Sequence, residues 1–230
     1  MLRYALTDTE PVRPKRLRFN LLSAEEIRRM SVCQVTETTL YYRGLPATGS
    51  LLDPLMGSID RRHLCVSCMR DARTCPGHAG HIELAYPVYH FGYVDTVLKV
   101  LRTVCFHCTR MCATDADLDA ARAQHGRQRL ASIHAAVRGR RACPHCRIVR
   151  PSFTRTAFGI QIEWPEDFAW ESEEERAYCT APFTAREALS MLSHLTDDDV
   201  ELLGFSAQTS HPRNMIAQNL VVPPPCARPA

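Results

Sequence analysis

Cysteine pairs separated by two residues are the strongest chemical signal in this sequence. Cys65-Val-Ser-Cys68 is followed shortly by Cys75-Pro-Gly-His78. Each two-residue spacing lets one tight turn present two ligands to a single tetrahedral ion, as in structural zinc sites. Gly77 and Gly80 are expected to allow the turn that directs the histidine at the ion. We therefore predict a first Zn²⁺ site built from Cys65, Cys68, Cys75 and His78.

A second set of cysteines repeats this spacing later in the chain. Cys105-Phe-His-Cys108 and Cys143-Pro-His-Cys146 would supply four thiolates to a second Zn²⁺, with Cys112 as a competing ligand. Metal bonds and helix packing must offset the entropy of closing the long segment between the two pairs. Four histidines lie close to these motifs without the required ligand spacing: His63, His81, His107 and His145. The three remaining cysteines have no partner at metal-ligand spacing and are interpreted as small hydrophobic residues: Cys33, Cys179 and Cys226.

Both predicted ions are structural, because catalytic zinc usually keeps one position open for water. With four protein ligands the sites carry net charges of about −1 and about −2. Nearby arginines are expected to offset these charges: Arg61, Arg62, Arg70 and Arg73 at the first site, and Arg140, Arg141, Arg147 and Arg150 at the second. No phosphate-binding glycine loop, nucleophile elbow or H-E-x-x-H motif occurs.

The acidic segment 165–176 offers carboxylates that could form a paired acid–base site. A solvated loop or helix face is the favoured interpretation, because nothing nearby would hold a shifted pKa. His134, which lies on an apolar helical stripe, is likewise interpreted as a packed core residue and not as a ligand. On its residues alone, the sequence describes a zinc-stapled module without a catalytic centre.

Composition narrows the class of protein further. Of the 28 basic residues only Lys15 and Lys99 are lysines, and the formal net charge is only +3. Arginine suits phosphate contacts, but we favour the codon bias of a GC-rich genome as the origin of this excess. The N-terminus has no signal-peptide pattern and the chain has no apolar run of about 18 residues, so no membrane span is predicted. The eleven cysteines, mostly in spaced pairs, therefore favour metal binding over disulfide bonds. A reducing compartment is expected for the same reason.

The elements that must position these ligands combine helices with short strands, so we predict an α+β fold, mainly helical, with long ordered loops. Capping boxes at Ser23 and Thr184, an N-cap at Thr114 and the run Thr196-Asp-Asp-Asp199 predict helix starts. Helical periodicity covers residues 94–104 and a stripe formed by Leu130, Ile133, His134 and Val137. Alternation predicts strands at 82–88, with Pro87 marking an edge, and at 160–164. An ordered loop is expected at 41–60 and an extended polyproline strap at 222–229.

Several stretches, in order, carry a specific resemblance. Three of them resemble motifs in the largest subunit of multisubunit DNA-directed RNA polymerases. They are Phe19-Asn-Leu-Leu-Ser-Ala-Glu-Glu-Ile-Arg-Arg-Met-Ser-Val32, Leu51-Leu-Asp-Pro-Leu-Met-Gly-Ser-Ile-Asp-Arg61 and Cys75-Pro-Gly-His-Ala-Gly-His-Ile-Glu-Leu-Ala-Tyr-Pro-Val-Tyr-His90. The final Val222-Pro-Pro-Pro-Cys-Ala-Arg-Pro229 is similar to the motif that closes the same region. The resemblance covers residues 17 to 230 and is closest to archaeal, eukaryotic and viral subunits.

The resemblance implies a fragment of the polymerase clamp, the jaw that closes over DNA and the RNA–DNA hybrid. It implies the same eight ligands to two structural Zn²⁺ ions. It also implies four segments: an extended lead-in (1–20), a clamp core segment with the first zinc site (21–104), a clamp head-like segment with the second (105–180), and a helical return with the proline-rich strap (181–230). Expected partners are the remainder of the largest subunit, other polymerase subunits, DNA and the hybrid.

One departure from the family limits the expected activity. The family's magnesium-binding NADFDGD motif does not occur in these residues. Phosphoryl transfer needs metal held by carboxylates, so Mg²⁺ is expected only in another portion of the subunit, and this chain alone is not expected to catalyse nucleotidyl transfer. The alternatives are a free-standing zinc-ribbon transcription regulator or a non-functional truncation. The expected location is the nucleus or cytoplasm, or a viral factory or virion if the gene belongs to a large DNA virus.

Overall fold

A computed structural model describes residues 15, 19–60, 62–157, 159–166, 168–170, 172–174, 176 and 182–228. Its helices and turns of 3-10 helix are α1 (Ala24–Met30), η1 (Pro54–Met56), α2 (Val94–Thr103), α3 (Asp115–Arg122), α4 (Gly126–Val137), α6 (Ala185–Ser193), α7 (Asp197–Leu202), η2 (Pro212–Met215) and η3 (Pro225–Ala227). Its strands are β1 (Tyr41–Tyr42), β2 (Leu45–Pro46), β3 (Gly80–Tyr89), β4 (Ser152–Arg155), β5 (Ile160–Glu163) and β6 (Ile216–Val222). The predicted α+β mixture of helices and short strands is confirmed.

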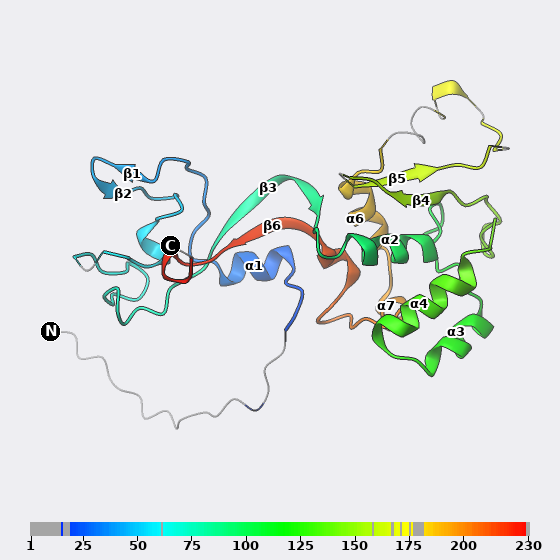
Figure 1. Ribbon diagram of the computed structural model, residues 1–230, viewed down its shortest axis with the longest axis horizontal. Helices are drawn as coiled ribbons and strands as arrows, with labels where there is room; N and C mark the ends of the chain where they lie inside the picture. Colours follow the sequence, from blue (N-terminus) through cyan, green and yellow to red (C-terminus); the bar gives the residue numbers. More distant parts are fainter. Residues whose placement is uncertain are drawn as a thin grey trace.

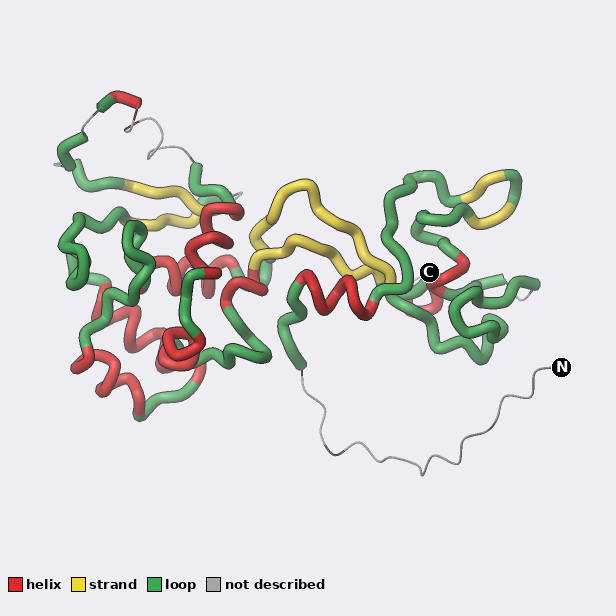
Figure 2. Tube along the Cα trace, turned by 180° about the vertical axis from the view of Figure 1, so that it is seen from behind, coloured by secondary structure: helices red, strands yellow, loops and turns green. Residues whose placement is uncertain are grey.

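The molecule is elongated, with a lobe at each end of a two-stranded ribbon (Figure 1). One end, here called the loop lobe, contains residues 31–79 and 223–228 and is dominated by loops and turns (Figure 2). The other end, the helical lobe, comprises the described part of residues 94–215 and holds five of the α-helices, α2 to α4, α6 and α7. Each lobe contains one of the two cysteine sets.

The ribbon is formed by β3 and β6, which pair antiparallel from Gly80 opposite Val222 to Tyr89 opposite Ile216. The register shifts between Glu83 and Val88, in the stretch that contains Pro87. Proline has no backbone N–H to donate to a ladder, so its position at the irregularity follows from its chemistry. The predicted strand at 82–88 is therefore confirmed, and β6 is its partner.

Helix α1 packs against β6 of the ribbon. The predicted capping box is present: Ser23 accepts from the Glu26 amide, while the Glu26 carboxylate accepts from Ser23. The buried Asn219 side chain donates to the carbonyl oxygen of Ala24 at 3.0 Å. A buried amide that finds such a partner avoids the cost of an unsatisfied polar group.

The core of the helical lobe follows the predicted apolar stripes. Val97 and Leu101 of α2 are fully buried, as are Ile133 and Val137 of α4, and these two helices pack together. The capping boxes at Thr184 and Thr196 open α6 and α7 as predicted. Fully burying side chains of this size contributes about 1.5–3 kcal/mol each, so the lobe does not depend on metal alone.

Three local expectations were wrong or incomplete. The ordered loop at 41–60 contains a hairpin, β1–β2, whose turn residues Arg43 and Gly44 both have positive φ, and the short helix η1. The helical stretch between the second set of cysteines is split into α3 and α4. The strap is not polyproline throughout, because Val222 ends β6 and buried Pro225 opens η3.

Some expectations fall on residues that are not described. Most of the lead-in at 1–20 lies outside the described residues, as do Arg61, Cys179 and part of the acidic segment 165–176. Among the described residues, no helix is both long and apolar enough to cross a membrane.

Candidate metal centres

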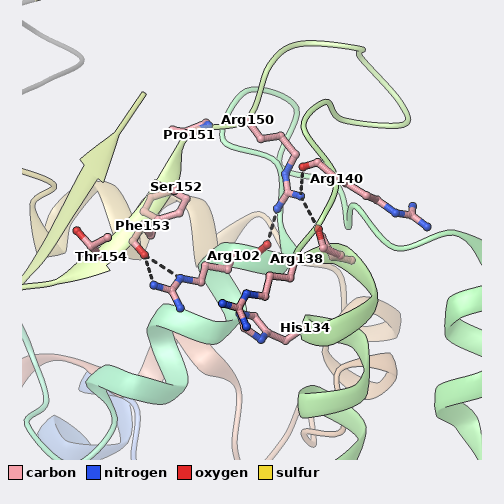
Figure 3. A pocket seen from close by; sticks show the side chains of 10 residues that line it. Arg102, His134, Arg138, Arg140, Arg150, Pro151, Ser152, Phe153 and Thr154 are labelled. Carbon is pink, nitrogen blue, oxygen red and sulfur yellow. Dashed lines mark hydrogen bonds between the residues drawn. The ribbon is translucent and has the colours of Figure 1, made fainter. Parts of the chain in front are cut away.

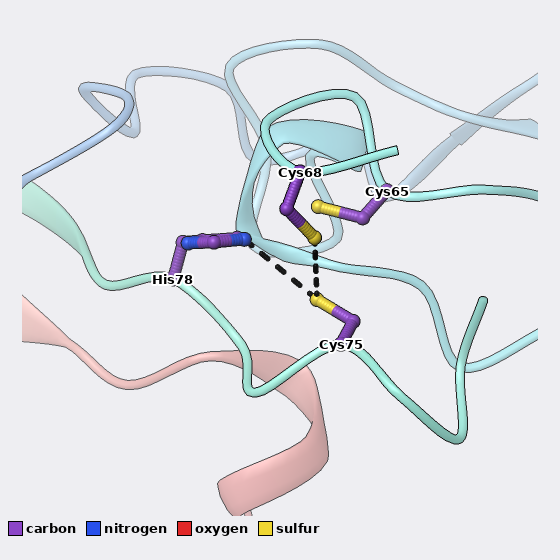
Figure 4. A group of neighbouring side chains, drawn as sticks. All are labelled: Cys65, Cys68, Cys75 and His78. Carbon is purple, nitrogen blue, oxygen red and sulfur yellow. Dashed lines mark hydrogen bonds between the residues drawn. The ribbon is translucent and has the colours of Figure 1, made fainter. Parts of the chain in front are cut away.

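The first set of predicted ligands converges in the loop lobe. The ligand atoms of Cys65, Cys68, Cys75 and His78 all lie within 4.8 Å of one another (Figure 4). The Cys68 and Cys75 sulfurs are 3.5 Å apart, and Nε2 of His78 is 3.7 Å from the Cys75 sulfur. Cys65 is fully buried, while the other three are partly exposed.

The second set converges in the helical lobe in the same way. Cys105, Cys108, Cys143 and Cys146 place their sulfurs within 4.8 Å of one another. The Cys105–Cys146 and Cys108–Cys143 sulfur distances are both 3.7 Å. The cysteine pair that precedes α3 in the chain thus lies next to the pair that follows α4.

These spacings fit a four-coordinate metal ion. A tetrahedron with metal–sulfur bonds of about 2.3 Å has sulfur–sulfur edges of about 3.8 Å. A disulfide bond would need about 2.05 Å, and the described cysteines are all free thiols. Both clusters can therefore hold a metal ion, and their soft thiolate ligands are compatible with zinc.

Three of the four ligand pairs use one backbone structure. In the first, the Met69 N–H donates to the Cys65 carbonyl oxygen at 2.8 Å, and the Cys65 N–H donates to the Arg70 carbonyl oxygen at 2.9 Å. The same two bonds recur around Cys105 at 3.0 and 2.9 Å and around Cys143 at 3.0 and 2.9 Å. These hydrogen bonds fold each C-x-x-C pair so that its two sulfurs face the same position, where a metal ion could bind.

Each of these turns requires a left-handed residue after its second cysteine. Met69, Thr109 and Arg147 have φ values of 57°, 56° and 61°. A side chain in this region costs on the order of 1–3 kcal/mol, which the paired backbone hydrogen bonds and a bound metal would offset. Sequence reasoning missed these three positions, although each directly follows the second cysteine of a C-x-x-C pair.

The fourth pair, Cys75 and His78, depends on Gly77. Gly77 has φ +81°, and its N–H donates to the Cys75 sulfur at 3.4 Å. Its predicted role in the turn is confirmed. Gly80 acts differently: an added Cβ would lie 2.7 Å from the Met56 sulfur, so Gly80 permits close packing and does not supply a positive φ.

Crowding of the thiols perturbs their ionisation. A hydrogen bond with His78 lowers the pKa of Cys68 to about 6, whereas burial raises the pKa of Cys75 to about 11. In the second cluster, burial raises the pKa of Cys108 to about 12. Burial and crowding thus favour the neutral thiol at some positions, and a divalent cation would favour the thiolates that serve as its ligands.

Three of the flanking arginines have local partners. Arg62 pairs with Asp60 at 3.0 Å, and Arg140 pairs with Asp117 at 2.6 Å. Arg150 donates to the carbonyl oxygens of Val137 and Arg140 at 3.3 and 3.4 Å. These three guanidinium groups make local contacts, and the expectation that flanking arginines offset the charge of the metal centres stays a prediction.

The near-miss residues stay outside both clusters. The Cys112 thiol is buried and lies 4.0 Å from the Arg110 carbonyl oxygen, and His145 contacts the Met111 carbonyl oxygen at 2.9 Å. His81 is buried against the Ser31 hydroxyl at 2.8 Å. Cys226 is exposed, and its sulfur lies 3.8 Å from the Pro76 carbonyl oxygen.

Comparison with known proteins decides the family. Residues 13–230 match the family described as RNA polymerase Rpb1, domain 1. The chain belongs to this family. The predicted resemblance to the N-terminal region of the largest polymerase subunit is thereby confirmed.

Relatives from three organisms are about one-third identical to this chain. The DNA-directed RNA polymerase II subunit RPB1 of Euplotoides octocarinatus is 32% identical over 230 residues, covering 94% of this chain and 48% of the relative. The Rpo1N subunits of Sulfolobus acidocaldarius and Thermococcus celer are 34% and 33% identical over 225 and 224 residues, covering 93% and 92% of this chain. The chain spans about half the length of the first relative and 24% of each of the other two.

Proposed function

We propose that this chain is the clamp portion of the largest subunit of DNA-directed RNA polymerase. Its role is to grip DNA and the RNA–DNA hybrid during transcription, without supplying the reacting groups. The family match over residues 13–230 is the observation that carries this proposal. Residues 21–104 would form the clamp core segment and residues 105–180 the clamp head-like segment.

The two clusters would hold structural Zn²⁺ ions. Cys65, Cys68, Cys75 and His78 would bind one ion, and Cys105, Cys108, Cys143 and Cys146 the other. Bound zinc supplies folding free energy and a fixed geometry. The loop lobe needs this most, because turns and loops bury less apolar surface than packed helices do.

The ribbon supports a gripping role mechanically. Strands β3 and β6 connect the lobes (Figure 1), so a movement of one lobe is transmitted through a hydrogen-bonded element. At the helical end, the Tyr89 hydroxyl lies 3.2 Å from the carbonyl oxygens of both Phe183 and Thr184. These contacts fix the ribbon to the helical lobe.

Catalysis would belong to another part of the subunit. Among the described residues, the only two groupings with metal-ligand proximity are the cysteine clusters, and neither includes a carboxylate. Polymerase chemistry needs Mg²⁺ held by carboxylates at the reacting phosphates. The chain would therefore act only in complex with the catalytic portion and other subunits, in the nucleus or cytoplasm.

An exposed apolar surface on the loop lobe supports such assembly. It surrounds a groove of about 410 Å³ beside the first metal centre. Ile59 is 67% exposed, Leu45 56% and Val66 55%, although all three are hydrophobic. Contiguous apolar surface of this kind marks protein–protein contacts.

Affinity purification from the native source followed by native mass spectrometry tests the proposal. We expect the chain in a complex with a polypeptide that carries the aspartate motif, with two zinc ions on this chain. A lone 26.0 kDa species with two zinc ions would instead indicate a free-standing regulator. A lone species without zinc would indicate a non-functional truncation.

A further inference from the structure

A cavity in the helical lobe has a strongly basic lining. It measures about 480 Å³ and lies between the C-terminal ends of α2 and α4 and strand β4 (Figure 3). Its charged and titratable lining residues are Arg102, His134, Arg138, Arg140 and Arg150. None of the described residues that line it is acidic.

Two of the arginines are held in place by neutral partners. Arg102 donates through Nε to the Phe153 carbonyl oxygen at 2.7 Å, and Arg150 donates to the Arg102 carbonyl oxygen. Figure 3 shows both guanidinium groups at the cavity. Carbonyl oxygens satisfy some of the N–H donors but leave the positive charge uncancelled, so both cations are oriented without being neutralised.

Arg140 and Arg138 differ from this pair. Arg140 is neutralised by Asp117 at 2.6 Å and also donates to the Cys112 carbonyl oxygen at 2.9 Å. Arg138 is exposed, and although its backbone N–H donates to the His134 carbonyl oxygen at 3.0 Å, its guanidinium forms no hydrogen bond or ion pair with the described residues. It is therefore the free cation at the rim of the cavity.

The pKa of His134 is affected by the same excess of positive charge. Burial, followed by the positive charges of Arg102, Lys99 and Arg138, lowers the pKa of His134. The neutral form of the imidazole is thus favoured, which can donate one hydrogen bond and accept another. Two acids contact lining residues: Asp117 pairs with Arg140 at 2.6 Å, and the Glu163 carboxylate accepts from the Thr154 hydroxyl at 2.9 Å.

We propose that this cavity binds a phosphate group, and that in the assembled polymerase this phosphate belongs to the DNA backbone. The inference rests on the proposed function and adds a contact site to it. Guanidinium groups that are fixed and uncancelled suit phosphate oxygens. Phe153 is the only phenylalanine, tyrosine or tryptophan among the described lining residues, and at 2% exposed it offers no face for stacking a base. Contacts of this type bind nucleic acid without reading its sequence.

A matched pair of substitutions tests the site. Arg138→Gln removes the free cation, and Arg127→Gln makes the same charge change at an exposed position in the first turn of α4, distant from the cavity in sequence. Fluorescence anisotropy of a short DNA duplex with the full zinc-loaded chain gives the affinity as a function of KCl concentration. We expect Arg138→Gln to reduce the slope of log K against log salt by about 0.9, the value for one phosphate contact. Arg127→Gln should leave the slope unchanged.

Equal slopes for the two variants would overturn the inference, because the cavity would then contribute nothing beyond general charge. A second measurement separates the sources of phosphate. If inorganic phosphate stabilises the parent chain more than the Arg138→Gln variant at equal ionic strength, while the DNA slopes stay equal, the site takes a free phosphate. That result would overturn the DNA assignment.

The two proposals fail in distinguishable ways. Absence of a complex with the catalytic polypeptide contradicts the clamp proposal, whatever the anisotropy shows. Equal slopes for the two variants, in a chain that does enter that complex, contradict the cavity proposal alone.

Discussion

Gly77 and Cys226 are in such close contact that a Cβ added to Gly77 would lie 2.6 Å from the Cys226 sulfur. The same Cβ would lie 2.7 Å from Pro224. The turn that carries His78 thus packs directly on the C-terminal segment, which reaches it along β6 (Figure 1). The first metal centre is therefore braced by a C-terminal segment about 150 residues away from it in sequence.

Gly77→Ala is expected to destabilise the loop lobe. The left-handed backbone alone costs a residue with a Cβ about 1–2 kcal/mol, and the overlap with Cys226 and Pro224 adds to this cost. Thermal unfolding of the zinc-loaded chain should show a melting temperature lower by several degrees. Gly139→Ala is the control, because a Cβ at Gly139 meets nothing within 4 Å. Equal melting temperatures for the two variants would contradict the packing described here.

Cys68→Ser should remove one zinc ion and unfold the first metal centre. Structural zinc contributes on the order of 10–16 kcal/mol of binding free energy in small zinc-dependent folds, so loss of a ligand has a large effect. Elemental analysis should give one zinc per chain in place of two. Cys112→Ser should keep two, because Cys112 lies outside the second cluster. Two zinc ions in the Cys68→Ser variant would refute the ligand set.

Thr109→Gly is expected to stabilise the second metal centre slightly. Thr109 is β-branched and has φ 56°, a conformation that glycine adopts without strain. Glycine removes the backbone strain in the folded state, which stabilises the protein, but it also makes the unfolded chain more flexible, which destabilises the protein. The net increase in the free energy of unfolding is up to about 1 kcal/mol. Urea unfolding measures the change. Thr109→Val, which keeps the branched shape but loses the hydroxyl, should gain nothing; if it matches Thr109→Gly, backbone strain is not the cause.

Asp117 should make the stability of the helical lobe dependent on pH. Hydrogen bonds from the Thr114 side chain and backbone, with the charge of Arg140, lower the pKa of Asp117. Because the folded-state pKa is below the unfolded value of about 3.9, the contribution is fully present above that pH. It is lost as the pH falls through the folded-state pKa.

Comparison with Asp117→Asn isolates this carboxylate from the acid-sensitive thiolates. The difference in unfolding free energy between the parent chain and the variant should be constant near neutral pH and shrink below pH about 4. A difference that does not change with pH would mean that Asp117 acts only through its shape and hydrogen bonds.

The sequence by itself determined the features that depend on neighbouring residues. Spacing within C-x-x-C pairs fixes which ligands one turn can present, and the capping boxes at Ser23, Thr184 and Thr196 satisfy amides within three residues. The apolar stripes of α2 and α4 likewise follow from local periodicity. These predictions held because each one depends on a few consecutive bonds.

Tertiary structure decided what depends on residues distant in the chain. Strand β6 was not predicted, because its burial does not alternate regularly and its pairing comes from β3. The role of Gly80 was wrongly predicted, and the partners of Arg140 and Arg150 were not foreseen, since their packing and hydrogen-bond partners are separated from them in sequence. The same reason applies to the basic cavity: its cations come from three segments that only the packing of α2, α4 and β4 brings together.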